Sequence, residues 1–163
     1  MNATPLESRY RDVLVVLEQN FGERLKTVVL FGSQARGEVR EGSDHDLFVV
    51  IEGLPRDPLA RQRMVRLTLL PVLDRLPEAI AFIAKTPDEF AANLTPLLLD
   101  VCMDGICLWG EAYFEPYRQR ALNALDEAGL RREVDGESLT WSFPELPKRN
   151  WELTWEGYRE YGG

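Results

Sequence analysis

The chain has 163 residues, of which 45% are hydrophobic, and its 27 acidic and 19 basic side chains give a formal net charge of -8. This length and apolar content suffice for one buried core with an appendage, and no apolar run is long enough to cross a bilayer. The acidic balance argues against general binding to nucleic acid, because a phosphate backbone attracts basic surfaces.

The N-terminus and the cysteines give two further expectations. MNATPLESRYRD lacks the basic region and apolar block of an export signal, so a cytoplasmic location is expected by default. Cys102 and Cys107 have no paired Cys or His partners of the kind that a zinc site needs. We expect both thiols to be reduced and to pack in the interior.

The first half of the chain reads as helix, strand, strand, helix. Apolar residues in 6–21 recur at spacings of three and four, which predicts a helix. TVVLF (27–31) and DLFVVI (46–51) are rich in β-branched and aromatic residues, which predicts two largely buried strands. Residues 58–76 are helical in pattern, and Pro71 is expected to kink or split that helix.

The next elements alternate between strands and short helices. AIAFIA (79–84) predicts a third strand, and TPDEF then offers a capping box between Thr86 and Glu89 at the start of a helix. Thr-Pro and Asp-Gly pairs supply start and stop signals for a helix over 96–104. ICLW (106–109) is expected to form a late edge strand.

The C-terminal part reads as an appendage. Residues 112–128 predict a helix, and the Asp-Gly pair within LRREVDGESLTWSF (130–143) is typical of a hairpin. Trp151, Trp155 and Tyr158 keep helical spacing, and we expect them to pack on the core, with an exposed partner-binding patch as the alternative. The appendage would extend the core, close over a site or form a homo-oligomer.

A Gly-Ser pair follows the first predicted strand. Gly32 lets the backbone approach a ligand closely, and Ser33 can both cap the following helix and donate its hydroxyl to a phosphate oxygen. A strand that ends at a helix N-terminus is a seat for an anion, although an ordinary capped turn has the same pattern. The segment is not a P-loop, because the Gly-Lys-Ser/Thr ending is absent.

Two aspartates stand at the head of the second strand. Asp44 and Asp46 point to the same face, while His45 points to the other and is expected to pack or hydrogen-bond there. Adjacent carboxylates repel each other, so a cation is expected between them, and Mg²⁺ takes carboxylate oxygens together with water and phosphates. The alternative for Asp44 is a loop or strand-start residue that water alone satisfies.

Gly32-Ser33, ten intervening residues and then Asp44-His45-Asp46 form a specific pattern. GSQARG and SDHDL resemble the GSxARG and SDxDL segments of the minimal nucleotidyltransferase domains of the DNA polymerase β superfamily. The resemblance covers about residues 1–110 and implies an α/β fold, a small mixed β-sheet flanked by helices (the nucleotidyltransferase fold). Residues 111–163 would add a C-terminal helix, a β-hairpin and an aromatic tail.

The resemblance also implies roles for particular residues. Gly32 and Ser33 would bind the triphosphate, and Asp44 and Asp46 would be the catalytic residues that hold Mg²⁺ or Mn²⁺. Arg36 would add positive charge near the phosphates, with a salt bridge on the helix surface as the equal alternative.

The implied reaction moves a nucleoside monophosphate, most plausibly AMP, from ATP or another nucleoside triphosphate to an acceptor hydroxyl. Two metal ions would stabilise the attacking and leaving oxygens. Many small members of this family act as antitoxins by modifying HEPN-domain proteins, so a HEPN-type partner protein is the acceptor that the resemblance suggests.

The family's third carboxylate has no evident counterpart here. Its expected position, counted back from TPDEF, is Ala81, and the nearest upstream acid, Glu78, would need a bulge to reach the site. Two functions therefore stay open. One is a nucleotidyltransferase, and the other is a catalytically impaired nucleotide-binding module that regulates a partner by contact.

Overall fold

The computed structural model describes residues 8–38, 43–75, 79–135 and 138–161. Most predicted elements are confirmed, and apart from the start of the first helix their ends shift by one or two residues. The helices are α2 (Arg11–Phe21), α3 (Gly32–Arg36), α4 (Pro58–Leu69), α5 (Pro87–Ala92), α6 (Pro96–Asp104) and α7 (Glu111–Ala128), with 3-10 turns η1 (Gly22–Arg24) and η2 (Leu70–Arg75). The strands are β1 (Leu25–Phe31), β2 (His45–Ile51), β3 (Ile80–Lys85), β4 (Ile106–Trp109), β5 (Arg131–Asp135), β6 (Ser138–Ser142), β7 (Asn150–Thr154) and β8 (Gly157–Tyr161).

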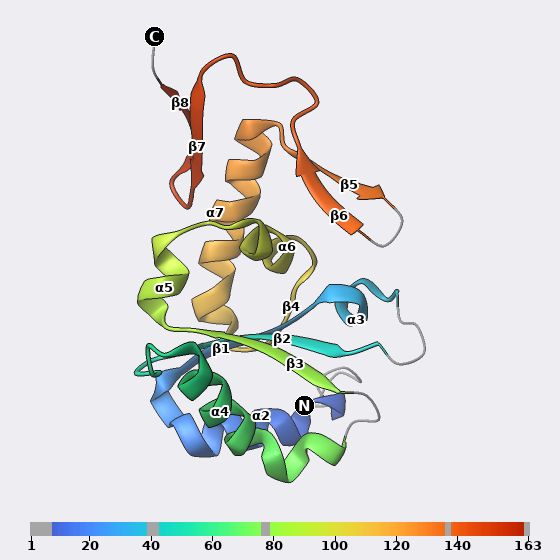
Figure 1. Ribbon diagram of the computed structural model, residues 1–163, viewed down its shortest axis with the longest axis vertical. Coiled ribbons are helices and arrows are strands. Elements are labelled where there is room, and N and C mark those ends of the chain that lie inside the picture. Colours follow the sequence, from blue (N-terminus) through green and yellow to red (C-terminus); the bar gives the residue numbers. More distant parts are fainter. Residues whose placement is uncertain (1–7, 39–42, 76–78, 136–137, 162–163) are drawn as a thin grey trace.

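A four-stranded mixed sheet with the order β3-β2-β1-β4 forms the centre of the molecule. The strands β2 and β3 are parallel, whereas β1 runs antiparallel to both β2 and β4. Helices α2 and α4 cover one face, and α5, α6 and α7 lie on the other side (Figure 1). This confirms the predicted mixed sheet flanked by helices and the edge position of ICLW.

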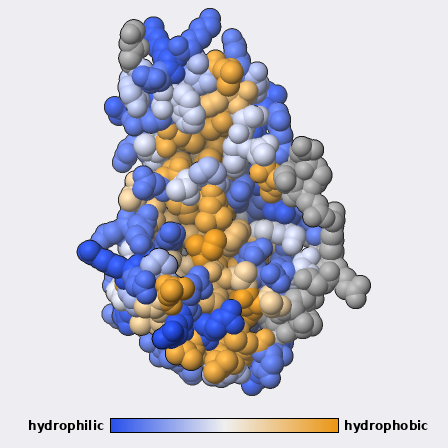
Figure 2. All heavy atoms as spheres, in the orientation of Figure 1, coloured by the Kyte–Doolittle hydropathy of each residue, from blue (hydrophilic) through white to orange (hydrophobic). Residues whose placement is uncertain are grey.

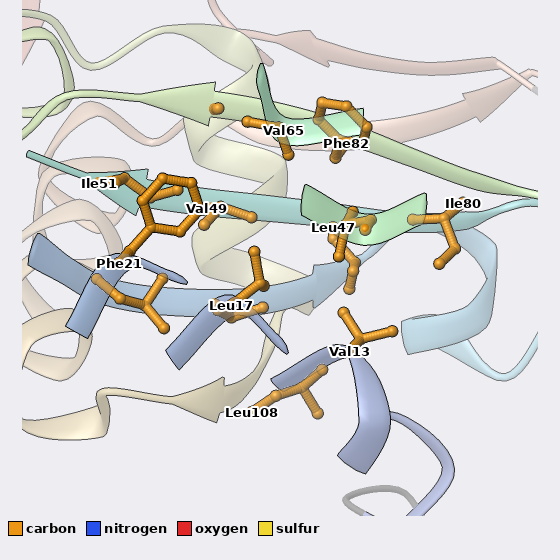
Figure 3. Packing of buried hydrophobic residues seen from close by; sticks show 14 of the residues in the cluster. Val13, Leu17, Phe21, Leu47, Val49, Ile51, Val65, Ile80, Phe82 and Leu108 are labelled. Atoms are coloured by element: carbon orange, nitrogen blue, oxygen red, sulfur yellow. The ribbon is translucent and has the colours of Figure 1, made fainter. Parts of the chain in front are cut away.

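The face under α2 and α4 holds one of two hydrophobic clusters. Side chains of β2 that alternate with the aspartates, such as Leu47 and Val49, meet Val13 and Leu17 of α2 (Figure 3). His45 lies on the same face, fully buried, where its Nδ1 is 2.7 Å from the hydroxyl of Tyr10. The expectation that His45 packs away from Asp44 and Asp46 is confirmed.

The opposite face packs against α5, α6 and α7. Phe48 and Val50 of β2 join Phe90 of α5 and Phe114 of α7 in the second cluster. Since strand side chains alternate, Asp46 belongs to this face, at the end where the apolar cover runs out. The sheet therefore brings Asp46 to the rim of a core rather than to an open surface.

Helix boundaries follow local signals that the sequence already contained. Helix α4 ends at Leu69 and gives way to the 3-10 turn that contains Pro71. Thr86 and Glu89 form the predicted capping box, with both reciprocal hydrogen bonds present. The part of the first predicted helix around Leu6, like Leu76 at the end of the second, lies outside the described residues.

The prediction for the last tryptophans is partly wrong. Residues 150–161 form the β7–β8 hairpin, with Trp155 at its turn, and no helix. Packing on the core is confirmed for Trp155, which is 6% exposed and donates from Nε1 to the Phe90 carbonyl at 3.0 Å, whereas Trp151 is 44% exposed. The β5–β6 hairpin is confirmed by the pairing of its strands, and residues 136–137, where the Asp-Gly pair ends, lie outside the described residues.

Hydrophobic residues also reach the surface. Figure 2 shows a hydrophobic band along one face of the molecule, between hydrophilic flanks. On the outer side of α4 and η2, the leucines Leu59, Leu67 and Leu70 are 78%, 61% and 59% exposed. None of the helices that the structure describes has the length and apolar content of a membrane span.

Trp155 connects the C-terminal hairpin to the core, so its loss should destabilise the fold. We expect Trp155→Ala to lower the free energy of unfolding by about 3–5 kcal/mol, because it removes a buried indole that contacts Phe90 and Tyr117. Trp151→Ala is the matched control and should lower it by less than about 1 kcal/mol. Urea unfolding of both variants measures the difference, and equal losses would contradict the assignment.

Candidate functional site

Gly32 is required where β1 turns into α3. Its φ of +73° lies in the left-handed region, and a β-carbon there would collide with Oδ2 of Asp46 and lie 3.2 Å from its Cγ. Phe31, the preceding residue, is the register partner of Asp46 in β1 and β2. The Gly-Ser turn and the Asp-x-Asp segment are therefore in direct contact, as the shared site requires.

Ser33 presents an unused hydroxyl beside this contact. The prediction that it caps the helix is wrong: α3 begins at Gly32, and Phe31 stands at the N-cap position without a side-chain hydrogen bond. The Ser33 side chain makes no hydrogen bond to any residue that the structure describes, while its carbonyl accepts from the backbone N–H of Glu38 at 3.0 Å. The hydroxyl is thus available to a ligand oxygen.

Gln34 is a site residue that the sequence did not reveal. It is 7% exposed, donates from Nε2 to the Ser43 carbonyl at 3.3 Å and accepts from Arg9 at 3.3 Å. These bonds tie α3 to the segment that leads into Asp44. A glutamine in a short polar stretch reads as a solvated residue, so the sequence holds no signal for this role.

The two aspartates differ in their surroundings. Asp44 precedes β2 and is exposed, whereas Asp46 lies within the strand and is half-buried. Burial raises the pKa of the Asp46 carboxyl above its ordinary value, and the Asp44 charge raises it further, while the charges of Arg36 and His45 act in the opposite direction. The carboxylate pair is therefore electrostatically unfavourable without a cation.

Ala81 occupies the position directly across from Asp46. The parallel register of β2 and β3 pairs Asp46 with Ala81, and the Ala81 side chain is exposed on the same face. Glu78, considered as a substitute for the third carboxylate, lies outside the described residues. Within the described part of the chain, no group of three or more His, Cys, Asp or Glu side chains could hold a metal ion.

The donor set fits one divalent cation better than two. Asp44 and Asp46 offer carboxylate oxygens on one side, and Mg²⁺ ordinarily completes its shell with water and substrate phosphates. A second ion would need a further protein ligand near Ala81, where only a methyl group is present. The residues thus suit an ion that arrives with a triphosphate.

Arg36, at the end of α3, makes the ion pairs that the sequence left as an alternative. Its Nε is 3.1 Å from Oε2 of Glu38, and its Nη1 is 3.6 Å from Oδ2 of Asp104. The same guanidinium lowers the pKa of Asp46 through its charge, so it lies close enough to act on the carboxylate. Arg36 therefore borders the site while it is paired at the surface.

The raised pKa of Asp46 predicts a stability cost that depends on pH. Because the folded pKa exceeds the unfolded value of about 3.9, ionised Asp46 destabilises the fold above the folded pKa, and the effect vanishes below the unfolded one. We expect Asp46→Asn to melt at a higher temperature than the unaltered chain at about pH 7 and at the same temperature at about pH 3.

Asp44→Asn is the matched control for this measurement. It removes the same repulsion between the carboxylates but relieves no burial, so its gain in melting temperature at neutral pH should be smaller. Calorimetry of the three proteins across this pH range makes the comparison. A melting temperature of Asp46→Asn that stays at or below that of the unaltered chain would contradict the assignment.

Comparisons with known proteins agree with this geometry. The chain matches the model of a nucleotidyltransferase domain over residues 11–92, which is half of its length. MJ1305 of Methanocaldococcus jannaschii, which carries the name of a candidate protein adenylyltransferase, is 30% identical over 102 residues, 62% of this chain and 69% of that protein.

Two solved structures show the same fold. A chain from a toxin-antitoxin crystal structure with AMP-PNP aligns with a TM-score of 0.52 at 20% identity, over 76% of this chain and 89% of that one. A chain from the Shewanella oneidensis complex of a tri-AMPylated HEPN toxin with an MNT antitoxin aligns with a TM-score of 0.50 at 18% identity, over 76% and 88%. The family model matches over half of the chain, and Gly32 lies against Asp46 in a mixed sheet. This chain therefore belongs to the nucleotidyltransferase domain family.

Proposed function

We propose that this protein transfers a nucleoside monophosphate, AMP in the first instance, from a nucleoside triphosphate to a hydroxyl group of a partner protein. The observation that carries the proposal is the contact of the Gly32 backbone with the Asp46 carboxylate. This contact brings an anion-binding turn and a cation-binding carboxylate pair to one point. A metal-bound triphosphate needs both at that spacing.

Each residue of the site has a task in this proposal. The backbone at Gly32 and the free hydroxyl of Ser33 bind phosphate oxygens, and Arg36 adds a positive charge. Asp44 and Asp46 hold Mg²⁺ or Mn²⁺, which supplies neutralisation of the phosphate charge. The positive charge of the bound ion also stabilises the ionised form of Asp46, whose pKa burial raises.

The reaction that suits this arrangement is attack of a hydroxyl oxygen on the α-phosphorus of ATP, with pyrophosphate as the leaving group. The hydroxyl proton has to go to water or to the acceptor itself, because Ala81 offers no carboxylate opposite Asp46. We therefore expect turnover to be slow. The nucleotide is positioned well, and the acceptor is activated poorly.

A HEPN-type toxin is the acceptor class that we propose. The support is the likeness to the candidate adenylyltransferase of Methanocaldococcus jannaschii and to the chain solved with a tri-AMPylated HEPN toxin. In this proposal the protein acts as an antitoxin, and the attached AMP blocks its partner. The exposed leucines of α4 and the half-exposed Trp151 offer apolar surface to such a partner.

A second candidate function is regulation by contact without transfer. Ala81 at the position opposite Asp46 favours it, since the acceptor side of the site lacks a ligand. So does an apolar groove of about 450 Å³ between α6 and the C-terminal strands, whose walls include Leu99, Trp141 and Trp151. Here the nucleotide would bind and the groove or the tail would hold the partner.

Transfer of label from α-labelled ATP to host-cell protein and RNA, with Mg²⁺ or Mn²⁺, tests the first function. The unaltered chain should label a protein band, and Asp46→Asn should lower the labelling by roughly 100-fold or more. The reason is that a bound metal ion stabilises the charge of the transition state by several kcal/mol, and each factor of ten in rate corresponds to about 1.4 kcal/mol. Ala81→Asp should raise the labelling, because it restores a carboxylate across from Asp46.

Ala81→Asn is the matched control, because asparagine has the size of aspartate but no charge, and it should leave the labelling at the level of the unaltered chain. If Ala81→Asp and Ala81→Asn behave alike, position 81 does not limit the reaction. If the unaltered chain labels nothing and only Ala81→Asp does, the protein is a nucleotide-binding module and the transferase assignment is wrong.

Contact with a partner is measured by tryptophan quenching. Trp151 is 44% exposed and Trp155 only 6%, so a soluble quencher such as iodide should reach Trp151 and spare Trp155. Adding a HEPN-type partner protein should protect Trp151 from the quencher, and this protection should be absent in Trp151→Phe. Unchanged quenching in the presence of a bound partner would place the contact elsewhere and remove the tail from the second candidate function.

A further inference from the structure

An acidic pair on α6 faces the β5–β6 hairpin. Asp100 and Asp104 lie one helical turn apart, where two like charges repel, and Asp104 is the last residue of the helix, where the dipole disfavours a carboxylate. Arg132 of β5 lies between them. Its Nη2 donates to Oδ1 of Asp104 at 2.7 Å, its Nη1 donates to the other oxygen, and Nη1 also reaches Asp100 at 3.4 Å.

The neighbouring strand holds this arrangement in place. Trp141 of β6 donates from Nε1 to Asp100 at 3.0 Å, and the guanidinium of Arg132 lies 5.7 Å from the centre of the Trp141 ring. Hydrogen bonds from Arg132 to Asp104 raise the pKa of that guanidinium. The β5–β6 hairpin is thereby fixed to α6 through two carboxylates.

Asp104 has a second basic neighbour, which belongs to the nucleotide site. Nη1 of Arg36 is 3.6 Å from Oδ2 of Asp104, and the exposed fractions of the Arg36 and Asp104 side chains are 20% and 12%. In Figure 1 the hairpin extends toward α3, the helix that ends with Arg36. One carboxylate therefore joins the C-terminal extension to the Gly-Ser helix.

The two arginines are held with unequal strength. Arg132 binds Asp104 through two parallel hydrogen bonds, which is the strong geometry for this pair. Arg36 approaches beyond hydrogen-bond length, and its one hydrogen bond within the described residues goes to Glu38, whose side chain is 68% exposed. A phosphate can therefore take Arg36 from Asp104 without leaving that carboxylate unpaired.

We propose that Arg132 is a positioning residue of the nucleotide site, which occupies Asp104 so that Arg36 remains available to the triphosphate. The proposal rests on the proposed function, because it takes Arg36 as a phosphate ligand. It makes the β5–β6 hairpin, which lies beyond the residues 11–92 of the family match, a part of that site. Without Arg132, the ion pair of Arg36 with Asp104, now 3.6 Å long, would tighten to a direct hydrogen bond.

Binding of ATP with Mg²⁺, measured by titration calorimetry, tests this step with a pair of variants. Arg132→Ala should raise the dissociation constant of ATP by roughly tenfold, because it withholds one charge-assisted hydrogen bond from the triphosphate. Adding Asp104→Asn to that variant should restore binding to within about twofold, because the competing carboxylate is gone. If Arg132 had a purely structural role, the double variant would bind ATP no better than Arg132→Ala, because it loses still more contacts.

Controls separate this proposal from the function on which it rests. Arg131→Ala removes an exposed positive charge from the same strand and should leave the dissociation constant unchanged. If the unaltered chain does not bind ATP, the proposed function fails. If the unaltered chain binds ATP and Arg36→Ala binds it equally well, Arg36 is no phosphate ligand and the positioning role fails with it. If the unaltered chain binds ATP and Arg36→Ala binds it more weakly, but Arg132→Ala binds normally or the double variant is not restored, the positioning role alone is wrong.

Arg132→Lys keeps the experiment decisive if Arg132→Ala does not fold. Lysine keeps the charge but cannot form two parallel bonds to one carboxylate. ATP binding weaker than that of the unaltered chain, restored by Asp104→Asn in the same chain, would support the positioning role. Binding equal to that of the unaltered chain would overturn it.

Discussion

The contact of Gly32 with the Asp46 carboxylate is the constraint on which the rest of the site depends. It requires β1 to end beside the beginning of β2 and excludes any side chain at position 32. The antiparallel register of β1 and β2 enforces it, and the packing on both faces of these strands enforces that register, because a slip of one residue would exchange the side chains that enter the two hydrophobic clusters. The hydrophobic core thus positions the polar site.

The same geometry explains why the site is unfavourable when it holds no ligand. Asp46 lies on the sheet face that Phe48 and Val50 bury, so its charge is only partly hydrated and lies near that of Asp44. The two carboxylates cost stability rather than provide it, so their presence is not explained by a structural role. Their position at the rim of the second cluster fits a role in which a metal-bound nucleotide supplies the missing positive charge.

The C-terminal extension contributes both to the stability of the core and to the surroundings of the nucleotide site. Trp155 fills the core beside Phe90, whereas Arg132 reaches the acidic pair on α6 that neighbours Arg36. Hairpins of this kind are marginal alone and need a surface to pack on. The extension gains that surface from α6 and α7, and in return it sets the electrostatic surroundings of the Gly-Ser helix.

Local signals in the sequence determined the order of the elements, the capping box at Thr86 and the split at Pro71, because hydrophobic period, caps and turns depend on neighbouring residues. The pairing of Gly32-Ser33 with Asp44-Asp46 was predicted from the spacing that resembles the nucleotidyltransferase motif. Non-local contacts decided the rest. Gln34 is buried only because Ser43 and Arg9 come to it, and the helical spacing of Trp151, Trp155 and Tyr158 yielded to hairpin pairing. The meeting of Arg36, Asp104 and Arg132 joins three distant segments, so only the tertiary structure could establish it.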